Sequence, residues 1–237
     1  MDTRHTILQV PFNGLTPEST LDTLMFFLRS NRNHLVVTPN PEAVMLAQRN
    51  ETFLNVLKEA DLVLPDGIGI LLAAKWLKIP IPARVPGCDI TLSLLKAAKN
   101  HSCYLLGAAP GVADNAMLNL QHQGINVLGA RDGYFDEKTE KIVLEEIHSL
   151  KPDILLVGMG MPQQEEWTMS HLHTLPCKVT LCVGGTIDVL AGNVRRAPKI
   201  LRRLGLEWLY RLAREPKRAR RMLELPRFVV AVFREGI

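Results

Sequence analysis

Short apolar runs alternate with longer amphipathic stretches along the chain as far as about residue 190. The runs have the length of buried strands, and the stretches between them have the residue spacing of helices. This alternation predicts an α/β fold, a Rossmann-like and mostly parallel sheet flanked by helices. The predicted strands are 34–38, 62–64, 103–107, 125–128, 153–157 and 178–183.

Loop residues rich in Gly, Pro, Asn and Asp follow most of these runs. In open α/β sheets, ligands bind outside the carboxyl ends of the strands, so these loops form the candidate site. They cover residues 38–41, 65–67, 107–111, 158–162 and 184–186.

The alternation stops after Gly192, and the remaining residues have a helical pattern with a break expected near 215. Pro216 suits the first turn of a new helix. A segment of about 40 residues cannot bury a core of its own. We therefore divide the chain into a core domain, 1–193, and a basic helical appendage, 194–237.

The appendage also holds nearly all the excess positive charge. The whole chain has 28 Lys and Arg against 24 Asp and Glu, whereas residues 194–237 have 13 against 4. Apolar residues alternate with the arginines there, which suits a helix lying on an anionic membrane surface. The alternative is that these apolar residues pack on the sheet. The appendage lacks a stacking-rich aromatic pattern and any nucleic-acid-binding motif, so we expect no nucleic acid partner.

The four cysteines and the N-terminal residues indicate the cellular compartment of the protein. No C-x-x-C pair is present, and most of the cysteines lie in apolar runs, which indicates buried, reduced thiols. No signal peptide and no apolar stretch of about 18 residues is visible. We expect a cytoplasmic protein that associates peripherally with the inner face of the plasma membrane. The oligomeric state stays open, a homo-oligomer included.

The standard motifs for nucleotides and metals are missing. Residues 67–72 lack the third glycine of G-x-G-x-x-G, and there is no P-loop. There is also no D-x-D and no H-E-x-x-H motif. The sequence therefore predicts neither a protein-bound metal nor a cofactor.

Three polar residues follow the first two of these strands. Asp66, between Pro65 and Gly67, is placed to act as a general base on a substrate hydroxyl. It is equally a preferred residue to cap the following helix. Thr38 and Asn40 suit hydrogen bonds to a sugar or nucleotide, although Asn between prolines is also a common turn residue.

Later loops add weaker candidates. Gln164 and Glu165 lie where a loop enters a helix whose free N–H groups favour phosphate, or they cap that helix with solvated side chains. Glycines after the last strand let a ligand approach the backbone. Arg84 lies in a loop, where an arginine is usually solvated surface. The candidates after the last strand are Gly184, Gly185, Thr186 and Asp188.

Arg214, Arg218 and Arg221 are spaced four and three residues apart, so they share a helix face if the helix continues past Pro216. Such a face either contacts an anionic partner or is solvated.

Nine segments, in order and with matching spacing, resemble the WecG/TagA/CpsF family of bacterial glycosyltransferases over nearly the whole chain. They are residues 38–42, 65–69, 84–89, 105–111, 132–135, 158–165, 184–192, 196–198 and 206–211.

The resemblance implies an inverting, metal-independent transferase. Its substrates would be a UDP-sugar donor and a polyprenyl-diphosphate-linked GlcNAc acceptor at the cytoplasmic membrane face. In this interpretation Asp66 is the base, and Thr38, Asn40 and Gln164 line the pocket. The appendage arginines close over it and neutralise the diphosphate, which needs cationic help in the absence of a metal. The remaining substrate-binding candidates are Arg84, Gly107, Gly184, Gly185, Thr186, Asp188, Arg196, Arg211, Arg214, Arg218 and Arg221.

The shared motifs identify the reaction and leave the donor open. We favour N-acetylmannosamine, because a uronate would need a dedicated cation in the pocket and none stands out among the loops of the acidic core domain. UDP-N-acetylmannosaminuronate and UDP-glucose are the alternatives. Two rival interpretations are a non-catalytic, membrane-associated sugar-nucleotide binder, in which Asp66 only caps a helix, and a nucleic-acid-binding protein.

Overall fold

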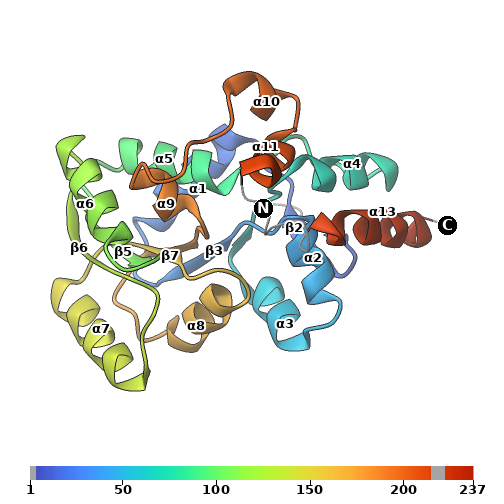
Figure 1. Ribbon diagram of the computed structural model, residues 1–237. Helices are drawn as coiled ribbons and strands as arrows, with labels where there is room; N and C mark the ends of the chain where they lie inside the picture. The colour runs from blue at the N-terminus through green and yellow to red at the C-terminus, as the bar shows by residue number, and fades with distance from the viewer. Residues whose placement is uncertain (1–3, 215–221, 237) are drawn as a thin grey trace.

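The computed structural model describes residues 4–214 and 222–236. Its centre is a parallel six-stranded sheet with strand order β4-β3-β8-β7-β5-β6 and helices on both faces (Figure 1). The Rossmann-like α/β prediction is confirmed. The strands are β3 (His34–Val37), β4 (Leu62–Val63), β5 (Cys103–Gly107), β6 (Val127–Arg131), β7 (Ile154–Gly158) and β8 (Val179–Cys182).

A two-stranded antiparallel hairpin precedes the sheet, which the apolar pattern did not predict. It consists of β1 (Arg4–Ile7) and β2 (Val10–Asn13). The helices of the core domain are α1 (Pro17–Phe27), α2 (Pro41–Ala47), α3 (Glu51–Glu59), α4 (Ile68–Trp76), α5 (Gly87–Ala97), α6 (Val112–His122), α7 (Glu137–Leu150), α8 (Gln163–His171) and α9 (Thr186–Leu190).

The sheet is buried on both faces, as expected for parallel strands covered by helices. One face packs against α1, α5, α6 and α9, with Leu24, Leu94 and Ala116 among the buried contacts. The other face packs against the hairpin and α2, α3, α7 and α8, with Phe53 and Ile147 buried there. Because both faces of the sheet are covered, a site formed by loops lies at the ends of the strands.

The described part of the appendage consists of α10 (Lys199–Arg203), α11 (Glu207–Arg214) and α13 (Glu224–Glu235). In α13, Phe228 and Val232 are buried in the same cluster as residues of α2 and α4. Glu224 of α13 accepts hydrogen bonds from both terminal nitrogens of Arg49, each at 3.1 Å. Part of α13 thus packs on the core domain, in a buried cluster that also contains strand residues, which is what the packing alternative expects for Phe228 and Val232. The break expected near residue 215 lies outside the described residues.

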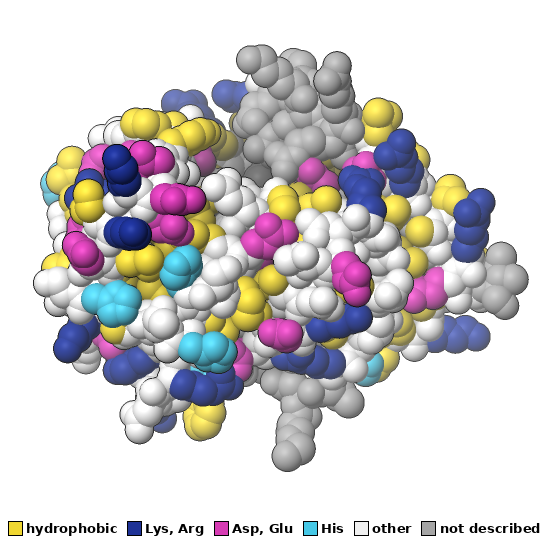
Figure 2. Space-filling view, turned by 90° about the horizontal axis from the view of Figure 1, so that it is seen from below, with side chains coloured by type: hydrophobic (Ala, Val, Ile, Leu, Met, Phe, Trp, Pro, Cys, Tyr) yellow, Lys and Arg dark blue, Asp and Glu magenta, His cyan; other side chains and the backbone are white. Residues whose placement is uncertain are grey.

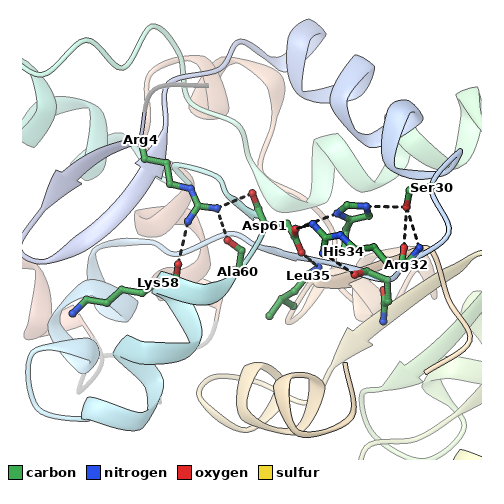
Figure 3. A network of polar contacts seen from close by, with 9 residues as sticks. Arg4, Ser30, Arg32, His34, Leu35, Lys58, Ala60 and Asp61 are labelled. Carbon is green, nitrogen blue, oxygen red and sulfur yellow. Dashed lines mark hydrogen bonds and ion pairs between the residues drawn. The ribbon is translucent and has the colours of Figure 1, made fainter. Parts of the chain in front are cut away.

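A polar network closes the amino end of the sheet beside β3 and β4 (Figure 3). Asp61 forms an ion pair with Arg32, lies 3.1 Å from Nδ1 of His34, and accepts the N–H of Leu35 at 3.0 Å. Burial alone would raise the pKa of Asp61, but the hydrogen bonds from Arg32, Leu35 and His34 outweigh it, and the pKa lies below its usual value.

His34 completes this network from within β3. Its ring stacks on Phe27 with 3.9 Å between centroids, and Nε2 lies 2.8 Å from the hydroxyl of Ser30. Burial lowers the pKa of His34, which favours the neutral ring. At this end of the sheet, most polar groups have partners within the protein, although Nδ1 of His34 approaches Asp61 without hydrogen-bond geometry.

Candidate active site

A cavity of about 180 Å³ opens at the opposite, carboxyl end of the sheet. Loops after β3, β4, β7 and β8 enclose it, which is where ligands bind in open α/β sheets. Six of the site residues predicted from the sequence line it together: Thr38, Asn40, Asp66, Gln164, Gly184 and Gly185.

Asp66 is half-buried and does not cap the helix that follows it. The N-cap of α4 is Gly67, with φ +94° and no side-chain hydrogen bond to the helix. Instead, Oδ2 of Asp66 accepts the N–H of Gly87, the first residue of α5, at 3.3 Å. The positive end of the α5 dipole thus faces the carboxylate. The alternative of a cap on its own helix is wrong.

Glycine is needed at position 87 because Thr38 lies against it. A Cβ there would lie 2.8 Å from the Thr38 hydroxyl oxygen. The backbone N–H of Asp66 donates to the carbonyl of Pro39 at 3.2 Å, which ties the loop after β4 to the loop after β3. The sequence therefore brings Thr38 and Asp66 together through backbone contacts as well as through strand order.

Asn40 has a structural task as well as a place in the cavity lining. It is the N-cap of α2, and its Oδ1 accepts the N–H of Ala43 at 3.0 Å. This bond fixes the orientation of the amide group.

Gln164 joins two glycine loops from within the protein. Its Oε1 accepts the N–H of Gly160 at 3.3 Å and that of Gly184 at 3.1 Å. Its Nε2 donates to Oε1 of Glu165 at 2.7 Å. Both side chains are only 5% exposed, so the alternative in which they are solvated capping groups is wrong.

Glu165 also lines the cavity; the sequence named it only as a weak candidate beside Gln164 and gave it no role in the pocket. Its Oε2 is buried and has no hydrogen-bond partner. Burial raises the pKa of this carboxyl to about 7. The residue spacing on α8 indicates the burial of Glu165. It lies three residues before Thr168 and seven before the C-cap residue Leu172, and both are buried. Residues at this spacing share one face of a helix, here the inward face.

Several other predicted residues lie near this edge but outside the cavity lining. Gly107 ends β5, where a Cβ would lie 2.4 Å from the carbonyl carbon of Gly158, so this glycine allows the close packing of neighbouring strands. Thr186 is buried at the start of α9, and Asp188 is its third residue.

A cationic cluster lies at the start of α5; we call it the Asp89 cluster. Asp89 forms ion pairs with Arg196 and with Arg202, the latter at 3.3 Å. Arg84 donates to the backbone carbonyl of Arg202 at 3.0 Å, so it is not merely solvated surface. Three arginines thus surround one carboxylate.

The charges in the Asp89 cluster shift the pKa values of Asp89 and Arg196. Burial alone would raise the pKa of Asp89, but the hydrogen bond from Arg196 and the charges of Arg196, Arg202 and Arg84 outweigh it and lower that pKa. The bond to Asp89 in turn raises the pKa of Arg196. Nε and Nη2 of Arg196 are buried and have no hydrogen-bond partner. The arginines of the cluster therefore place positive charge around Asp89, two residues after Gly87, whose N–H donates to Asp66.

The predicted arginines further along the appendage are only partly described. The guanidinium of Arg214 lies 5.4 Å from the ring centroid of Tyr210 on α11. The side chain of Arg211 lies outside the description, as do Arg218 and Arg221 entirely. Their predicted role stays a prediction.

The appendage presents apolar side chains beside α4. Trp76 and Phe233 meet edge to face at 4.4 Å between centroids, and both remain largely exposed. Toward the right-hand rim of Figure 2, the end at which α13 finishes, hydrophobic and basic side chains lie interspersed. The exposed apolar side chains of these two helices are Leu72, Trp76, Val229, Val230 and Phe233.

Residues 4–214 and 222–236 contain no group of three His, Cys, Asp or Glu side chains placed to hold a metal ion. In the same residues, no helix has the length and hydropathy of a membrane span.

Comparison with known proteins agrees with this geometry. Residues 5–237 match the glycosyl transferase WecG/TagA/CpsF family. A Staphylococcus aureus (strain MRSA252) protein is 37% identical over 231 residues, covering 95% of this chain and 91% of the relative. A Bacillus spizizenii protein is 37% identical over 212 residues, covering 88% and 82%. Both are named N-acetylglucosaminyldiphosphoundecaprenol N-acetyl-beta-D-mannosaminyltransferase. The chain belongs to the WecG/TagA/CpsF family and is a glycosyltransferase.

Proposed function

We propose that this chain is an inverting, metal-independent transferase. It moves N-acetylmannosamine from UDP-N-acetylmannosamine to undecaprenyl-diphosphate-linked N-acetylglucosamine, in the synthesis of a cell-wall or surface polysaccharide. The observation that carries the proposal is the position of Asp66, a carboxylate lining a cavity that opens at the carboxyl end of the sheet. The names of the two relatives, each covered over most of its length, support the same reaction.

In this mechanism Asp66 is the general base. It accepts the proton of the acceptor hydroxyl while that oxygen attacks the anomeric carbon of the donor sugar. The new bond forms on the face opposite the diphosphate, the bond from the anomeric carbon to the phosphate oxygen breaks, and UDP leaves. A single displacement of this kind inverts the configuration at the anomeric carbon.

The remaining lining residues position the sugars. The Thr38 hydroxyl lies beside the start of α5, and in our proposal it hydrogen-bonds the acceptor. Gln164 keeps the loops after β7 and β8 at a fixed separation. Because a misplacement of about 1 Å can cost about 100-fold in rate, such bracing contributes to catalysis without chemistry of its own.

The departing UDP needs positive charge. In our proposal the Asp89 cluster and the arginines 211, 214, 218 and 221 of the appendage supply it in place of a metal ion. The charge of the cluster supports this role, because Arg196 and Arg202 both pair with Asp89 and Arg84 lies beside them, against the carboxylates of Asp89 and Glu207.

We also propose that the appendage holds the protein at the cytoplasmic face of the membrane, where the lipid-linked acceptor lies. The apolar side chains of α4 and α13 would enter the interface, and the basic residues of 194–237 would contact anionic headgroups. Together these residues form the membrane-facing part of the appendage, while 1–193 forms the catalytic core domain.

The test is a transfer assay with a soluble lipid-linked N-acetylglucosamine analogue and three donors in parallel. The donors are UDP-N-acetylmannosamine, UDP-N-acetylmannosaminuronate and UDP-glucose. We expect kcat/KM to be highest for UDP-N-acetylmannosamine. A higher value for either other donor would replace the donor and keep the reaction class. Failure to release UDP with all three would favour the non-catalytic binder.

A further inference from the structure

A second hollow in the surface lies outside the cavity that contains Asp66. It is an open groove of about 390 Å³, lined by five apolar residues and one cation. This volume falls within the roughly 300–1,000 Å³ of pockets that bind small molecules. The lining residues are Leu71, Lys75, Ile79, Pro80, Ile81 and Pro82.

The groove lies within one excursion of the chain that leaves the Asp66 loop and returns to it. Residues 68–76 leave as α4, and residues 79–86 return. Leu71 and Lys75 belong to the outgoing limb, and the other four lining residues belong to the returning limb. The same excursion therefore forms both walls of the groove.

Two hydrogen bonds close this excursion at the Asp66 loop. The N–H of Val85 donates to the carbonyl of Pro65 at 2.9 Å, and the N–H of Gly87 donates to Oδ2 of Asp66 at 3.3 Å. With a rise of about 1.5 Å per residue, the two lining residues of α4 lie about 6 and 12 Å along the helix from its N-cap, Gly67. The groove thus begins about one helical turn from the residue next to Asp66.

The lining combines an apolar surface with one positive charge. Lys75 is exposed, and it forms no ion pair with any residue of 4–214 or 222–236. Side chains on a helix tilt toward its N-terminus, which for Lys75 is the direction of Asp66. The other lining side chains carry no hydrogen-bonding group, so the groove does not suit the hydroxyls of a sugar or a uracil ring. It suits an apolar chain with an anionic group at one end.

The end of α4 away from Asp66 lies at the apolar surface of the appendage. Leu72 and Trp76 follow the two lining residues of α4 directly in sequence and are largely exposed. Helix α13 runs beside α4, and its Phe233 meets Trp76 edge to face (Figure 1). A lipid chain that leaves a membrane at this surface would therefore meet the groove before its head group reaches the Asp66 loop.

We propose that the groove binds the first isoprene units of the lipid-linked acceptor and that Lys75 pairs with the acceptor diphosphate. This inference rests on the proposed function, in which the acceptor sugar is carried by a polyprenyl diphosphate. The sugar then reaches Asp66 at one end of α4, while the rest of the chain stays in the bilayer at the other end. The occupant is thus an isoprenoid diphosphate, and not the membrane itself or a second copy of this chain.

The experiment measures transfer without a membrane, with the donor that is most active in the transfer assay. The two soluble acceptors are N-acetylglucosamine diphosphates with a farnesyl chain or a methyl group, kept below micelle-forming concentrations. We expect kcat/KM to be at least about tenfold higher with the farnesyl acceptor, because burial of two methylene groups alone is worth roughly that factor. The difference should lie in KM, since a chain remote from the reacting atoms binds equally in the ground state and the transition state. Equal kcat/KM for the two acceptors would overturn the proposal.

Variants of the full chain locate the chain-binding surface. Leu71→Gln and Ile81→Gln change the two walls independently, and each should reduce the farnesyl-to-methyl ratio of kcat/KM by about fivefold, because apolar contact is lost. Leu118→Gln, an exposed leucine on α6, is the matched control and should keep the ratio. Leu72→Gln, outside the lining, should weaken liposome binding and keep the ratio. A ratio reduced in Leu72→Gln and unchanged in both groove variants would assign the chain to the exposed face and overturn the proposal.

Lys75→Gln tests the contact with the diphosphate. It should lower kcat/KM about tenfold with both acceptors, the equivalent of one charge-assisted hydrogen bond, and keep the farnesyl-to-methyl ratio. The loss should shrink as salt rises, because salt screens an exposed charge in the wild type as well. Lys78→Gln removes the same charge just beyond α4, outside the lining, and should change kcat/KM less than about twofold. Equal losses in the two lysine variants would overturn the pairing of Lys75 with the diphosphate.

Failure of the inference is distinguishable from failure of the proposed function. Farnesyl diphosphate is titrated into the protein by NMR of labelled leucine and isoleucine methyl groups, a readout that needs no turnover. If no acceptor is glycosylated, the function fails and the titration decides the inference. Shifts of the Ile79 and Ile81 signals that are lost in Leu71→Gln support it, and shifts confined to other methyl groups overturn it.

Two further measurements complete the comparison of the variants. Thermal unfolding shows whether each variant is folded, and the two groove variants allow a conclusion if one of them is not. Sedimentation measures self-association. If the groove variants abolish self-association and keep the farnesyl-to-methyl ratio, the groove is an interface between copies of this chain and the proposal is overturned.

Discussion

The two ends of the parallel sheet both hold buried carboxyl groups, in different states. At the amino end, Asp61 is surrounded by donors: Arg32, the Leu35 N–H and His34 (Figure 3). Its pKa is lowered because those hydrogen bonds outweigh burial. At the carboxyl end, Oε1 of Glu165 accepts the Gln164 amide, Oε2 is buried without a hydrogen-bond partner, and burial raises the pKa of this carboxyl.

This difference separates a structural use of a carboxyl group from a functional one. The groups around Asp61 lie on or just before the adjacent strand β3, so the network stabilises the fold and needs no ligand. Glu165 and Asp66 line the cavity at the other end, and burial of the Glu165 carboxyl, with one oxygen that has no hydrogen-bond partner, costs stability. Changes at the two ends should therefore affect different measurements.

The largest effect expected is on turnover, from Asp66→Asn. The substitution removes the base but keeps an oxygen that can accept the Gly87 N–H. We expect kcat to fall by about 10²–10⁴-fold while the free energy of unfolding changes little. Turnover near the wild-type value would return Asp66 to a purely structural role at the start of α5.

The next effect is on stability, from Glu165→Gln. The pKa of Glu165 is about 7 in the folded protein against a usual value of 4.5, so the folded state binds more protons between these values and stability falls as pH rises through them. Glutamine does not ionise. At about pH 8 the variant should be more stable than wild type by about 3 kcal/mol, and the difference should vanish below about pH 4. Denaturant unfolding at several pH values measures this; a pH-independent difference would contradict the buried, titrating carboxyl.

Asp61→Asn should do the reverse. It removes the ion pair with Arg32, and we expect a loss of about 1–3 kcal/mol of stability near neutral pH, with unchanged turnover per folded molecule. Because the folded pKa is depressed, the stabilisation is present above the unfolded pKa and is lost as the pH falls through the folded pKa. Denaturant unfolding and a transfer assay on the same samples separate the two quantities. A large loss of turnover without a loss of stability would contradict the structural role of Asp61 at the amino end of the sheet.

The smallest effect concerns single arginines of the appendage. Arg214→Ala, Arg218→Ala and Arg221→Ala should each reduce binding to anionic liposomes by about 1 kcal/mol, and binding of all forms should weaken as salt rises. An arginine that also contacts the leaving diphosphate should lose turnover on a water-soluble acceptor as well. Full activity of all three variants on that acceptor would leave the appendage as a membrane anchor alone.

The sequence predicted the sheet and the main lining residues because both follow from local patterns. Apolar runs mark the buried strands, and the residues after β3, β4, β7 and β8 must meet at one edge. The hairpin β1–β2 was missed because β1 is mostly polar, with Arg4, His5 and Thr6, and so forms no apolar run. The run at 125–128 marks a strand that begins later, at Val127.

What the sequence could not provide is which polar groups are paired. Asp66 followed by Gly67 has the local pattern of a helix cap, and only the tertiary fold places Gly87 against its carboxylate. Gln164 and Glu165 look like solvated residues of a first helical turn until the loops of Gly160 and Gly184 bury them. The Asp89 cluster joins positions more than 100 residues apart, for which the sequence has no periodic signal.

The most direct test of the central claim is sugar transfer by the wild-type chain in excess EDTA. UDP-N-acetylmannosamine and a lipid-linked N-acetylglucosamine analogue are the substrates, and both UDP and the lipid-linked disaccharide are quantified. The account predicts that the two products form in equal amounts, with an inverted anomeric configuration and at a rate that added Mg²⁺ or Mn²⁺ does not raise. UDP release without disaccharide, or activity that the chelator abolishes and the metal restores, would contradict it.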